Sequence, residues 1–344
     1  MSKVMKIKGR KSKNSEIVCS LENDAFPREI LKSALLLRGE EQEKMFALAR
    51  RRRDEHFPSM KVEVRSVIEI SNICSQGCRY CNMGKYHSNQ HYIMDHNLLL
   101  NLVEHLYGKG RRVILLQSGE NHNDSYIEHV TGCIREIMHK FKDLTLIMCI
   151  GNLDHDHYTQ IKKAGAQRYI LKFETSNPEH YKKIKPLDKL ENRLSCLEDL
   201  ISIGFQVGTG NITGLPYQTL DDIVNDLFLV KKFSLAMCSS SVFIPAETSE
   251  FKDEPVGDID LTLNTMALMR IMNPHLLMPT TSSLEKCRKD GQFMGLMAGA
   301  NTVTIHDGTP PELKSLFPIY SLDRVTPNKA HMENIVKRAK MKME

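Results

Sequence analysis

Short apolar runs alternate with longer amphipathic segments along most of the chain. From residue 62 onward, the short runs predict eight β-strands, at 64–71, 112–117, 144–150, 168–174, 205–210, 237–243, 276–281 and 301–305. Apolar positions at three- and four-residue spacing predict helices between them, at 96–109, 125–141, 155–164, 188–203, 219–232, 260–272 and 291–298. Strict alternation indicates right-handed parallel units. Eight of them close most naturally into a complete (β/α)8 barrel, the TIM-barrel fold of the α/β class.

The segment before the first strand predicts helices of its own. Apolar residues in 16–58 recur at helical spacing, whereas the first fifteen residues are polar and rich in lysine. A length of 344 residues would also allow two domains, but α/β barrels routinely use this many as one unit. We therefore expect a basic tail at 1–15, amino-terminal helices at 16–60, a barrel at 61–325 and a carboxyl-terminal helix at 326–344.

The composition, the apolar runs and the charge argue against several classes of protein. With 41% hydrophobic and 26% charged residues, the chain is neither disordered nor fibrous. No run of 18 apolar residues and no secretion signal occurs, so we expect a cytoplasmic protein without a membrane partner. The net charge of +5 comes partly from the tail and from Arg50–Arg53. No aromatic residues interleave with these basic runs, which favours a solvated face over a nucleic-acid partner.

The nine cysteines are unevenly spaced. Without a secretion signal they indicate thiol or metal chemistry instead of disulfides. Three of them, Cys74, Cys78 and Cys81, directly follow the first predicted strand, where a barrel carries its chemistry. The default role of the others is that of a small hydrophobic residue, and a part in the chemistry stays open for four that lie elsewhere in the barrel segment: Cys149, Cys196, Cys238 and Cys287.

The spacing Cys74-x3-Cys78-x2-Cys81 places three soft thiolates on one loop, which suits zinc or an iron–sulfur cluster. A structural zinc site would need a fourth ligand, and His87 could supply it. Three ligands fit a 4Fe-4S cluster better, because they leave one iron open.

This motif, with Tyr80 before its last cysteine, resembles the cluster loop of the radical S-adenosylmethionine (radical SAM) superfamily. Further segments, among them 117–120, 168–186 and 214–227, resemble the branch that contains the FeFe-hydrogenase maturase HydE, methylornithine synthase and biotin synthase, with HydE the nearest. The resemblance implies that the three cysteines hold a 4Fe-4S cluster whose fourth iron binds S-adenosylmethionine (SAM). Reductive cleavage of SAM then gives a 5′-deoxyadenosyl radical.

The resemblance also implies a set of SAM contacts. Backbone carbonyls at Ser118, Gly119 and Glu120 would accept from the SAM amino group, Glu174 from that group or a ribose hydroxyl, and Arg193 would bind the SAM carboxylate. Ile212 would pack on the adenine, and the backbone of Tyr80 would hold the adenine amino group. The alternatives are a solvent-facing Glu120, an Arg193 bound to a helix end, and a Tyr80 that only packs.

Candidate substrate contacts lie at or after the ends of the third, seventh and eighth predicted strands. Thr280, Thr281 and Ser282 match a stretch that borders the HydE cavity, and Asn152 stands where we would expect a glutamate. Thr304 and His306 end the eighth strand, although His306 could instead cap a local turn. No cysteine follows Cys287, so we expect no accessory cluster.

We therefore expect a radical SAM enzyme that acts on a small amino-acid-like or organometallic substrate. The first specific hypothesis is HydE-like maturation of the FeFe-hydrogenase cofactor, with a reductant such as ferredoxin or flavodoxin and a maturation or acceptor protein as partners. A methylornithine-synthase-like mutase and a sulfur-inserting enzyme of the biotin or lipoyl type stay open. So does an inactive metal-binding scaffold.

Overall fold

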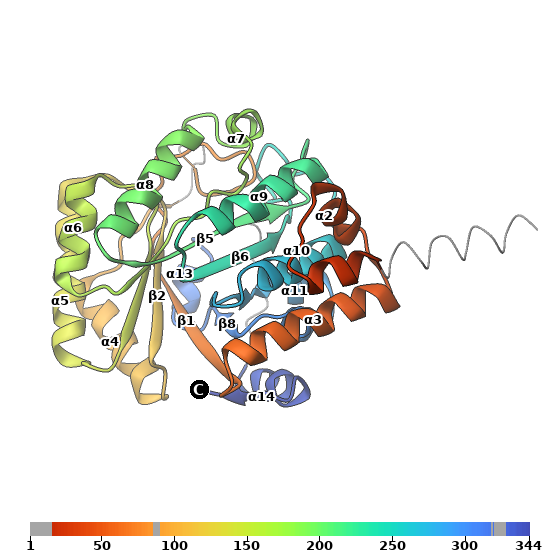
Figure 1. Ribbon diagram of the computed structural model, residues 1–344. Helices are drawn as coiled ribbons and strands as arrows, with labels where there is room; N and C mark the ends of the chain where they lie inside the picture. The colour runs from red at the N-terminus through yellow and green to blue at the C-terminus, as the bar shows by residue number, and fades with distance from the viewer. Residues whose placement is uncertain (1–15, 85–89, 318, 320–327) are drawn as a thin grey trace, which may run out of the picture.

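The structure is a computed structural model that describes residues 16–84, 90–317, 319 and 328–344, and its strands form a barrel (Figure 1). Eight strands alternate with helices in chain order, and a short ninth strand follows near the carboxyl end. The strands are β1 (Lys61–Ser71), β2 (Val113–Ser118), β3 (Thr145–Cys149), β4 (Arg168–Ile170), β5 (Gln206–Thr213), β6 (Met237–Val242), β7 (Pro279–Thr280), β8 (Thr302–Ile305) and β9 (Lys342–Met343).

All the strand pairs are parallel, and the order across the sheet is β6-β5-β4-β3-β2-β1-β8-β7. At the seam, β6 and β7 meet at an isolated bridge between Met237 and Leu277, where the Leu277 N–H donates to Ala236 O at 2.9 Å. The barrel is therefore nearly closed. Outside this circle, β9 pairs with the start of β1, with Lys342 opposite Lys61.

Helices surround the barrel (Figure 1). Those after each strand are α4 (His96–Gly108), α5 (Asp124–Lys140), α6 (His155–Ala164), α7 (Pro178–Ile184), α8 (Leu190–Ser202), α9 (Leu220–Lys232), α10 (Ile259–Met272), α11 (Ser282–Cys287), α12 (Gly291–Met297), α13 (Pro311–Lys314) and α14 (Lys329–Arg338). Strand residues such as Val64, Ile68 and Leu146 face outward and belong to the large apolar core with the helices. Alternate residues, among them Val67 and Leu115, form a separate apolar cluster inside the barrel.

Two amino-terminal helices, α2 (Arg28–Leu35) and α3 (Glu40–His56), cover one side of the barrel, where α2 contacts α9 and α3 contacts α10. Arg53 of α3 is buried, and its guanidinium donates to Leu296 O at 2.7 Å and Ala300 O at 3.1 Å. These bonds satisfy carbonyls at and beyond the end of α12 and tie the helical extension to the barrel.

The predicted fold class is confirmed, including the eight strands and the amino-terminal helices. Two strands are shorter than predicted. Regular pairing of the fourth ends at Ile170, because the chain reaches a left-handed conformation at Glu174 (φ 64°). The seventh shrinks to Pro279–Thr280, because the Met278 N–H before it donates to the Asn301 side chain and α11 begins at Ser282 just after it. The predicted tail and His87 lie outside the described residues, and the domain boundaries stay a prediction.

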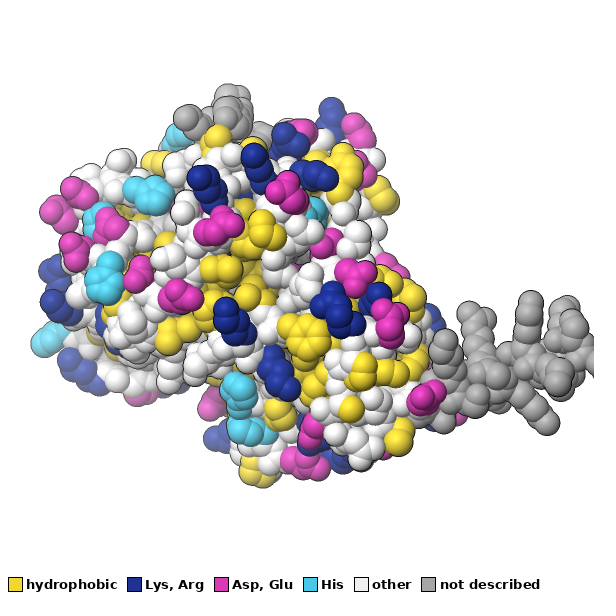
Figure 2. Space-filling view, turned by 45° about the horizontal axis from the view of Figure 1, so that its top comes forward, with side chains coloured by type: hydrophobic (Ala, Val, Ile, Leu, Met, Phe, Trp, Pro, Cys, Tyr) yellow, Lys and Arg dark blue, Asp and Glu magenta, His cyan; other side chains and the backbone are white. Residues whose placement is uncertain are grey.

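The surface carries mixed charge. On the face seen in Figure 2, Lys and Arg side chains are interspersed with Asp and Glu, so no field of one sign covers it. Within the described part of the chain, no helix is both long enough and apolar enough to cross a membrane.

Candidate functional site

One cavity of about 360 Å³ lies inside the barrel and gathers nearly all the predicted site residues. Its lining includes every predicted cluster and SAM residue together with four of the predicted substrate contacts: Cys74, Cys78, Tyr80, Cys81, Ser118, Gly119, Glu120, Glu174, Arg193, Ile212, Thr281, Ser282, Thr304 and His306. Asn152 and Thr280 are not part of the lining. Residues from distant parts of the sequence thus meet at the carboxyl ends of the strands.

The loop that carries the three cysteines is held by bonds to the end of one strand and the end of one helix. The Ser75 N–H donates to Glu120 O at 2.8 Å, after β2, and the Arg79 N–H donates to Ile184 O at 3.0 Å, at the end of α7. Gly119 lets the loop pack closely, since a Cβ there would lie 2.3 Å from the Ile73 carbonyl oxygen. The loop geometry therefore depends on the segment after β2 and on the end of α7.

The three thiols differ in exposure. Cys81 is buried, whereas Cys74 and Cys78 are half-buried, and none of the three is joined in a disulfide. Burial raises the pKa of Cys78, but the positive charges of Lys185 and Arg193 oppose that rise, as does a hydrogen bond with Tyr80. The site thus supplies cations that favour a thiolate at Cys78.

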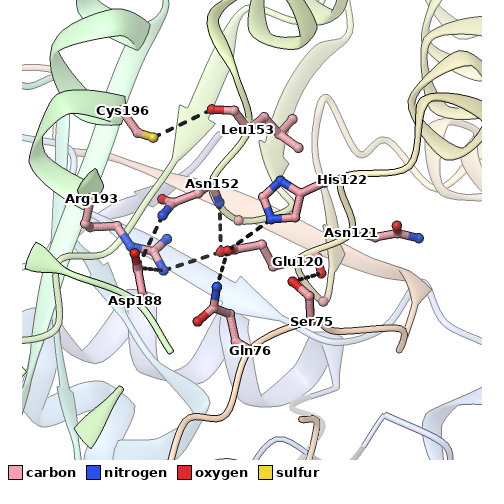
Figure 3. Close-up of polar contacts among 12 residues, drawn as sticks. Ser75, Gln76, Glu120, Asn121, His122, Asn152, Leu153, Asp188, Arg193 and Cys196 are labelled. Carbon is pink, nitrogen blue, oxygen red and sulfur yellow. Dashed lines mark hydrogen bonds and ion pairs between the residues drawn. The ribbon is translucent and has the colours of Figure 1, made fainter. Parts of the chain in front are cut away.

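Glu120 is the centre of a buried polar network (Figure 3). Its Oε1 accepts from Gln76 Nε2 at 2.6 Å, and its Oε2 accepts from the Asn152 N–H at 2.8 Å. Arg193 Nη2 lies 3.4 Å from Oε2, and His122 Nε2 lies 3.5 Å from Oε1. Burial would raise the pKa of this carboxyl, but His122 and Arg193 outweigh it and lower the pKa to about 2. The alternative of a solvent-facing Glu120 is therefore wrong.

Arg193 reaches this network from α8 and is itself buried. Its Nε donates to Tyr181 Oη at 3.2 Å, and its Nη2 lies 3.4 Å from Asp188 Oδ2. The same Asp188 oxygen accepts from Tyr181 Oη at 2.6 Å and lies 3.6 Å from Lys185 Nζ. Arg193 is thus oriented by side chains of the 181–188 segment and not by a helix end.

Glu174 lies just beyond β4 with a left-handed backbone, a conformation that costs about 1–2 kcal/mol for a residue with a side chain. Its Oε2 is 2.9 Å from Lys172 Nζ, and both residues line the cavity. Backbone bonds hold it beside β5, because its N–H donates to Gly210 O and its carbonyl accepts from Ile212 N, each at 3.0 Å. A strained residue at a cavity wall is typical of functional sites.

An apolar wall stands opposite these charges. Ile212 belongs to a buried cluster with Ile184, Leu215, Phe243 and Phe251, against which the Tyr80 ring packs. An apolar surface of this kind suits the flat face of a base.

Most but not all of the predicted substrate residues line the cavity. Thr281, Ser282 and Thr304 line the cavity. His306 also lines it, and its Nδ1 is 3.1 Å from the buried Glu69 Oε1, so its ring is oriented by a carboxylate. The Thr280 hydroxyl donates instead to Gln292 O at 2.9 Å, in α12.

Asn152 lies one layer behind the cavity wall. Its N–H donates to Glu120, and its side-chain Nδ2 donates to Asp188 Oδ2 at 3.2 Å (Figure 3). It therefore connects the two acidic residues of the network without reaching the cavity itself.

Sequence reasoning missed several charged residues at the site. Lys172, Lys185 and Arg65 line the cavity, and Asp188 holds Arg193, which lines it. The uncharged Gln76 was also missed, and it both lines the cavity and holds Glu120. The two-residue spacing of Lys172 and Glu174 could have pointed to Lys172. Cys149 also lines the cavity, whereas the three other cysteines left open do not: Cys196, Cys238 and Cys287.

The fold and the site together define a class of barrel enzymes in which three thiols and a charged network surround one internal cavity. The model of the radical SAM superfamily matches residues 68–230. The [FeFe] hydrogenase maturase subunit HydE of Thermotoga maritima is 33% identical over 309 residues, which are 89% of this chain and 87% of HydE. The chain belongs to the radical SAM superfamily, as its motifs indicated.

Two solved structures share the fold. Methylornithine synthase (PylB) has a TM-score of 0.79 at 20% identity, covering 95% of this chain and 97% of PylB. The FeFe-hydrogenase maturase HydG from Carboxydothermus hydrogenoformans has a TM-score of 0.81 at 20% identity, covering 98% of this chain and 80% of HydG.

Radical SAM enzymes use a 4Fe-4S cluster and SAM, and the residues present fit both groups. Three cysteine thiols on one short loop border the cavity, with cationic side chains beside Cys78. Among the residues that the structure describes, no three His, Cys, Asp or Glu side chains are grouped to hold one metal ion. A cubane cluster does not need that grouping, because each thiolate binds a different iron.

Proposed function

We propose that this protein is a HydE-like maturase that acts on a small or organometallic substrate inside its barrel during FeFe-hydrogenase cofactor assembly. The observation that carries the proposal is the convergence of Cys74, Cys78 and Cys81 with the Glu120–Arg193 network on one internal cavity. When bound, the cluster and SAM supply a 5′-deoxyadenosyl radical. The 33% identity to HydE favours this maturase role.

Different side chains of the cavity bind the cluster and SAM. The three cysteines ligate three irons and leave the fourth for SAM. Arg193 would bind the SAM carboxylate, because its guanidinium lines the cavity while Tyr181, Glu120 and Asp188 hold it through Nε and Nη2. The network keeps this guanidinium in place before the ligand arrives, which lowers the entropy cost of binding.

The remaining SAM contacts follow the two walls of the cavity. Glu174 accepts from the amino group or a ribose hydroxyl, while Ile212 packs on the adenine and the Tyr80 backbone holds its amino group. The Gly119 carbonyl accepts from the Ser118 hydroxyl at 2.6 Å, and the Glu120 carbonyl accepts from Ser75. The Gly119 carbonyl keeps a second lone pair with which to accept from the SAM amino group, whereas the Glu120 carbonyl already accepts from both the N–H and the hydroxyl of Ser75.

The substrate and partners are part of the same proposal. Thr281, Ser282, Thr304 and His306 present hydroxyl and imidazole groups to a polar substrate in the cavity. A ferredoxin- or flavodoxin-type protein supplies the electron, and a maturation or acceptor protein takes the product. None of the nine cysteines is joined in a disulfide, which fits a reducing compartment, so we place the enzyme in the cytoplasm.

Anaerobic reconstitution tests the chemistry. Purified protein loaded with iron and sulfide, then given dithionite and SAM, should bind about four irons per chain and form 5′-deoxyadenosine. Cys78→Ala should lose cluster iron and form no 5′-deoxyadenosine, whereas Cys19→Ala, at an exposed position away from the cavity, should behave as wild type. Wild-type protein that forms none, or Cys78→Ala that forms as much, overturns the radical SAM mechanism.

The maturase role needs a second assay. Inactive FeFe hydrogenase should become active when the other maturation proteins are supplied together with this one. It should stay inactive when the Cys78→Ala variant replaces the wild type. Methylornithine formed from lysine, or sulfur inserted into a biotin or lipoyl precursor, would assign the enzyme to one of the alternatives.

A further inference from the structure

Another buried carboxylate, that of Asp226, lies on α9, outside the cavity. Asp226 is fully buried, and every hydrogen bond described for it comes from a neutral donor. Its Oδ1 accepts from the Ser176 N–H at 2.7 Å and from the Ser176 hydroxyl at 2.6 Å. Its Oδ2 accepts from Asn211 Nδ2 at 2.8 Å. One helix residue thus holds two separate segments.

Both segments flank Glu174. Ser176 is two residues further along the same turn, and Asn211 on β5 is the residue that pairs with Glu174 in an isolated parallel bridge. Glu174 itself has a left-handed backbone, which a residue with a side chain adopts only when its surroundings hold it there. The hydrogen bonds of Asp226 with Ser176 and Asn211 are placed to hold Glu174 in this conformation from both sides.

We propose that Asp226 is a positioning residue that holds the 174–176 turn against β5, so that the Glu174 carboxylate faces the cavity and meets SAM. The inference rests on the proposed function, because it takes Glu174 to be a SAM contact. Asp226 touches neither SAM nor substrate and acts only through Glu174.

The carboxylate is suited to this task by its two acceptor oxygens. Asparagine has nearly the same shape, but one of its two ends is an NH2 donor. In Asp226→Asn, that NH2 would face either the two donors of Ser176 or the amide donor of Asn211. The variant would therefore lose its hydrogen bonds to one of these two residues. Asp222, on the same helix, raises the pKa of Asp226 by its negative charge. The charge of Asp226 in turn raises the pKa of Cys238 on β6.

The experiment measures SAM binding to cluster-loaded protein by equilibrium dialysis, with iron content checked for each variant. We expect Asp226→Asn to bind SAM about tenfold more weakly, which corresponds to about 1.4 kcal/mol. The KM for SAM should rise to a similar extent while kcat at saturating SAM stays within about twofold, because only SAM placement is affected. Iron content should equal that of the wild type.

A double-mutant cycle distinguishes an effect of Asp226 through Glu174 from a general loss of packing around the cavity. If Asp226 acts through Glu174, adding Asp226→Asn to Glu174→Ala should weaken SAM binding no further. The matched control is Asp222→Asn, a buried carboxylate one turn earlier that caps α9 and accepts from Asn177. It should bind SAM within about twofold of the wild type.

Three results would overturn the inference: unchanged SAM binding in Asp226→Asn, additive losses in the double variant, or an equal loss in Asp222→Asn. Should Asp226→Asn fail to fold, Ser176→Ala takes its place in the same cycle, with a smaller loss expected because the Ser176 N–H still donates. A wild type that binds no SAM refutes the proposed function itself, whereas a wild type that binds SAM with Asp226→Asn unaffected refutes the positioning role alone.

Discussion

Glu120 and Asp226 are both buried carboxylates, but one lies at the cavity wall and the other behind it. Glu120 meets Arg193 and His122, and its pKa is lowered to about 2. Around Asp226 the donors are neutral, and burial raises its pKa to about 7. The same chemical group therefore belongs to an ionised network in one region and works as an acceptor near neutrality in the other. Cationic partners make the difference.

The largest effect should come from breaking the ionised network. Arg193→Met keeps much of the side-chain volume but leaves Glu120 and Asp188 without the guanidinium. Removing one partner of a buried ion pair typically costs about 3–5 kcal/mol, and we expect the free energy of unfolding to fall by that amount. Urea unfolding followed by circular dichroism measures it. Arg51→Met, at an exposed pair with Glu22, is the control and should change it by less than about 1 kcal/mol.

If Arg193→Met unfolds at the wild-type urea concentration, the network contributes nothing to stability. Glu120 would then resemble Asp226 in energy despite the contrast in their partners.

A pH series should separate the two carboxylates next. The folded-state pKa of Asp226, about 7, lies above the ordinary value of 3.8, so the native protein binds more protons than the unfolded chain between these values. The contribution of Asp226 to stability is therefore present at low pH and is lost as pH rises toward 7. Relative to Asp226→Asn, the wild type should lose stability with a slope of about 1 kcal/mol per pH unit.

The comparison between these two proteins cancels the other titrating groups. The measurement is urea unfolding of both at several pH values from 5 to 8. Parallel curves across this range would show that Asp226 keeps one protonation state, and the contrast with Glu120 would then not extend to titration.

The sequence predicted the barrel well because a parallel α/β fold repeats one local pattern. Each strand was a short apolar run and each helix an amphipathic one, and the cysteine motif fell at a strand end where the fold places chemistry. The seventh strand shows where this reasoning stops. Thr280 and Thr281 are adjacent, so they face opposite sides, and only the register decides that Thr281 lines the cavity.

The charged network was harder to predict for a related reason. Arg193 was recognised, but its partner Asp188, and Lys185, which also pairs with Asp188, come from a turn between two helices that has no periodic pattern. Asp226 was read only as part of an amphipathic helix, because its partner Ser176 lies 50 residues away in sequence. Contacts of this kind depend on how the helices pack, which local spacing does not encode.

The smallest effect should come from trimming a single bond on the Asp226 side. Ser176→Ala removes the hydroxyl that donates to Asp226 Oδ1, while the backbone N–H of residue 176 still donates to the same oxygen. Loss of one neutral hydrogen bond typically costs about 1 kcal/mol, and urea unfolding at pH 5, where Asp226 is protonated and Glu120 is ionised, should show a decrease of that size. Gln76→Ala is the counterpart at Glu120 and should cost more, about 1.5–3 kcal/mol, because its amide donates to an ionised carboxylate. Equal losses in the two variants would mean that Asp226 and Glu120 carry the same charge at this pH.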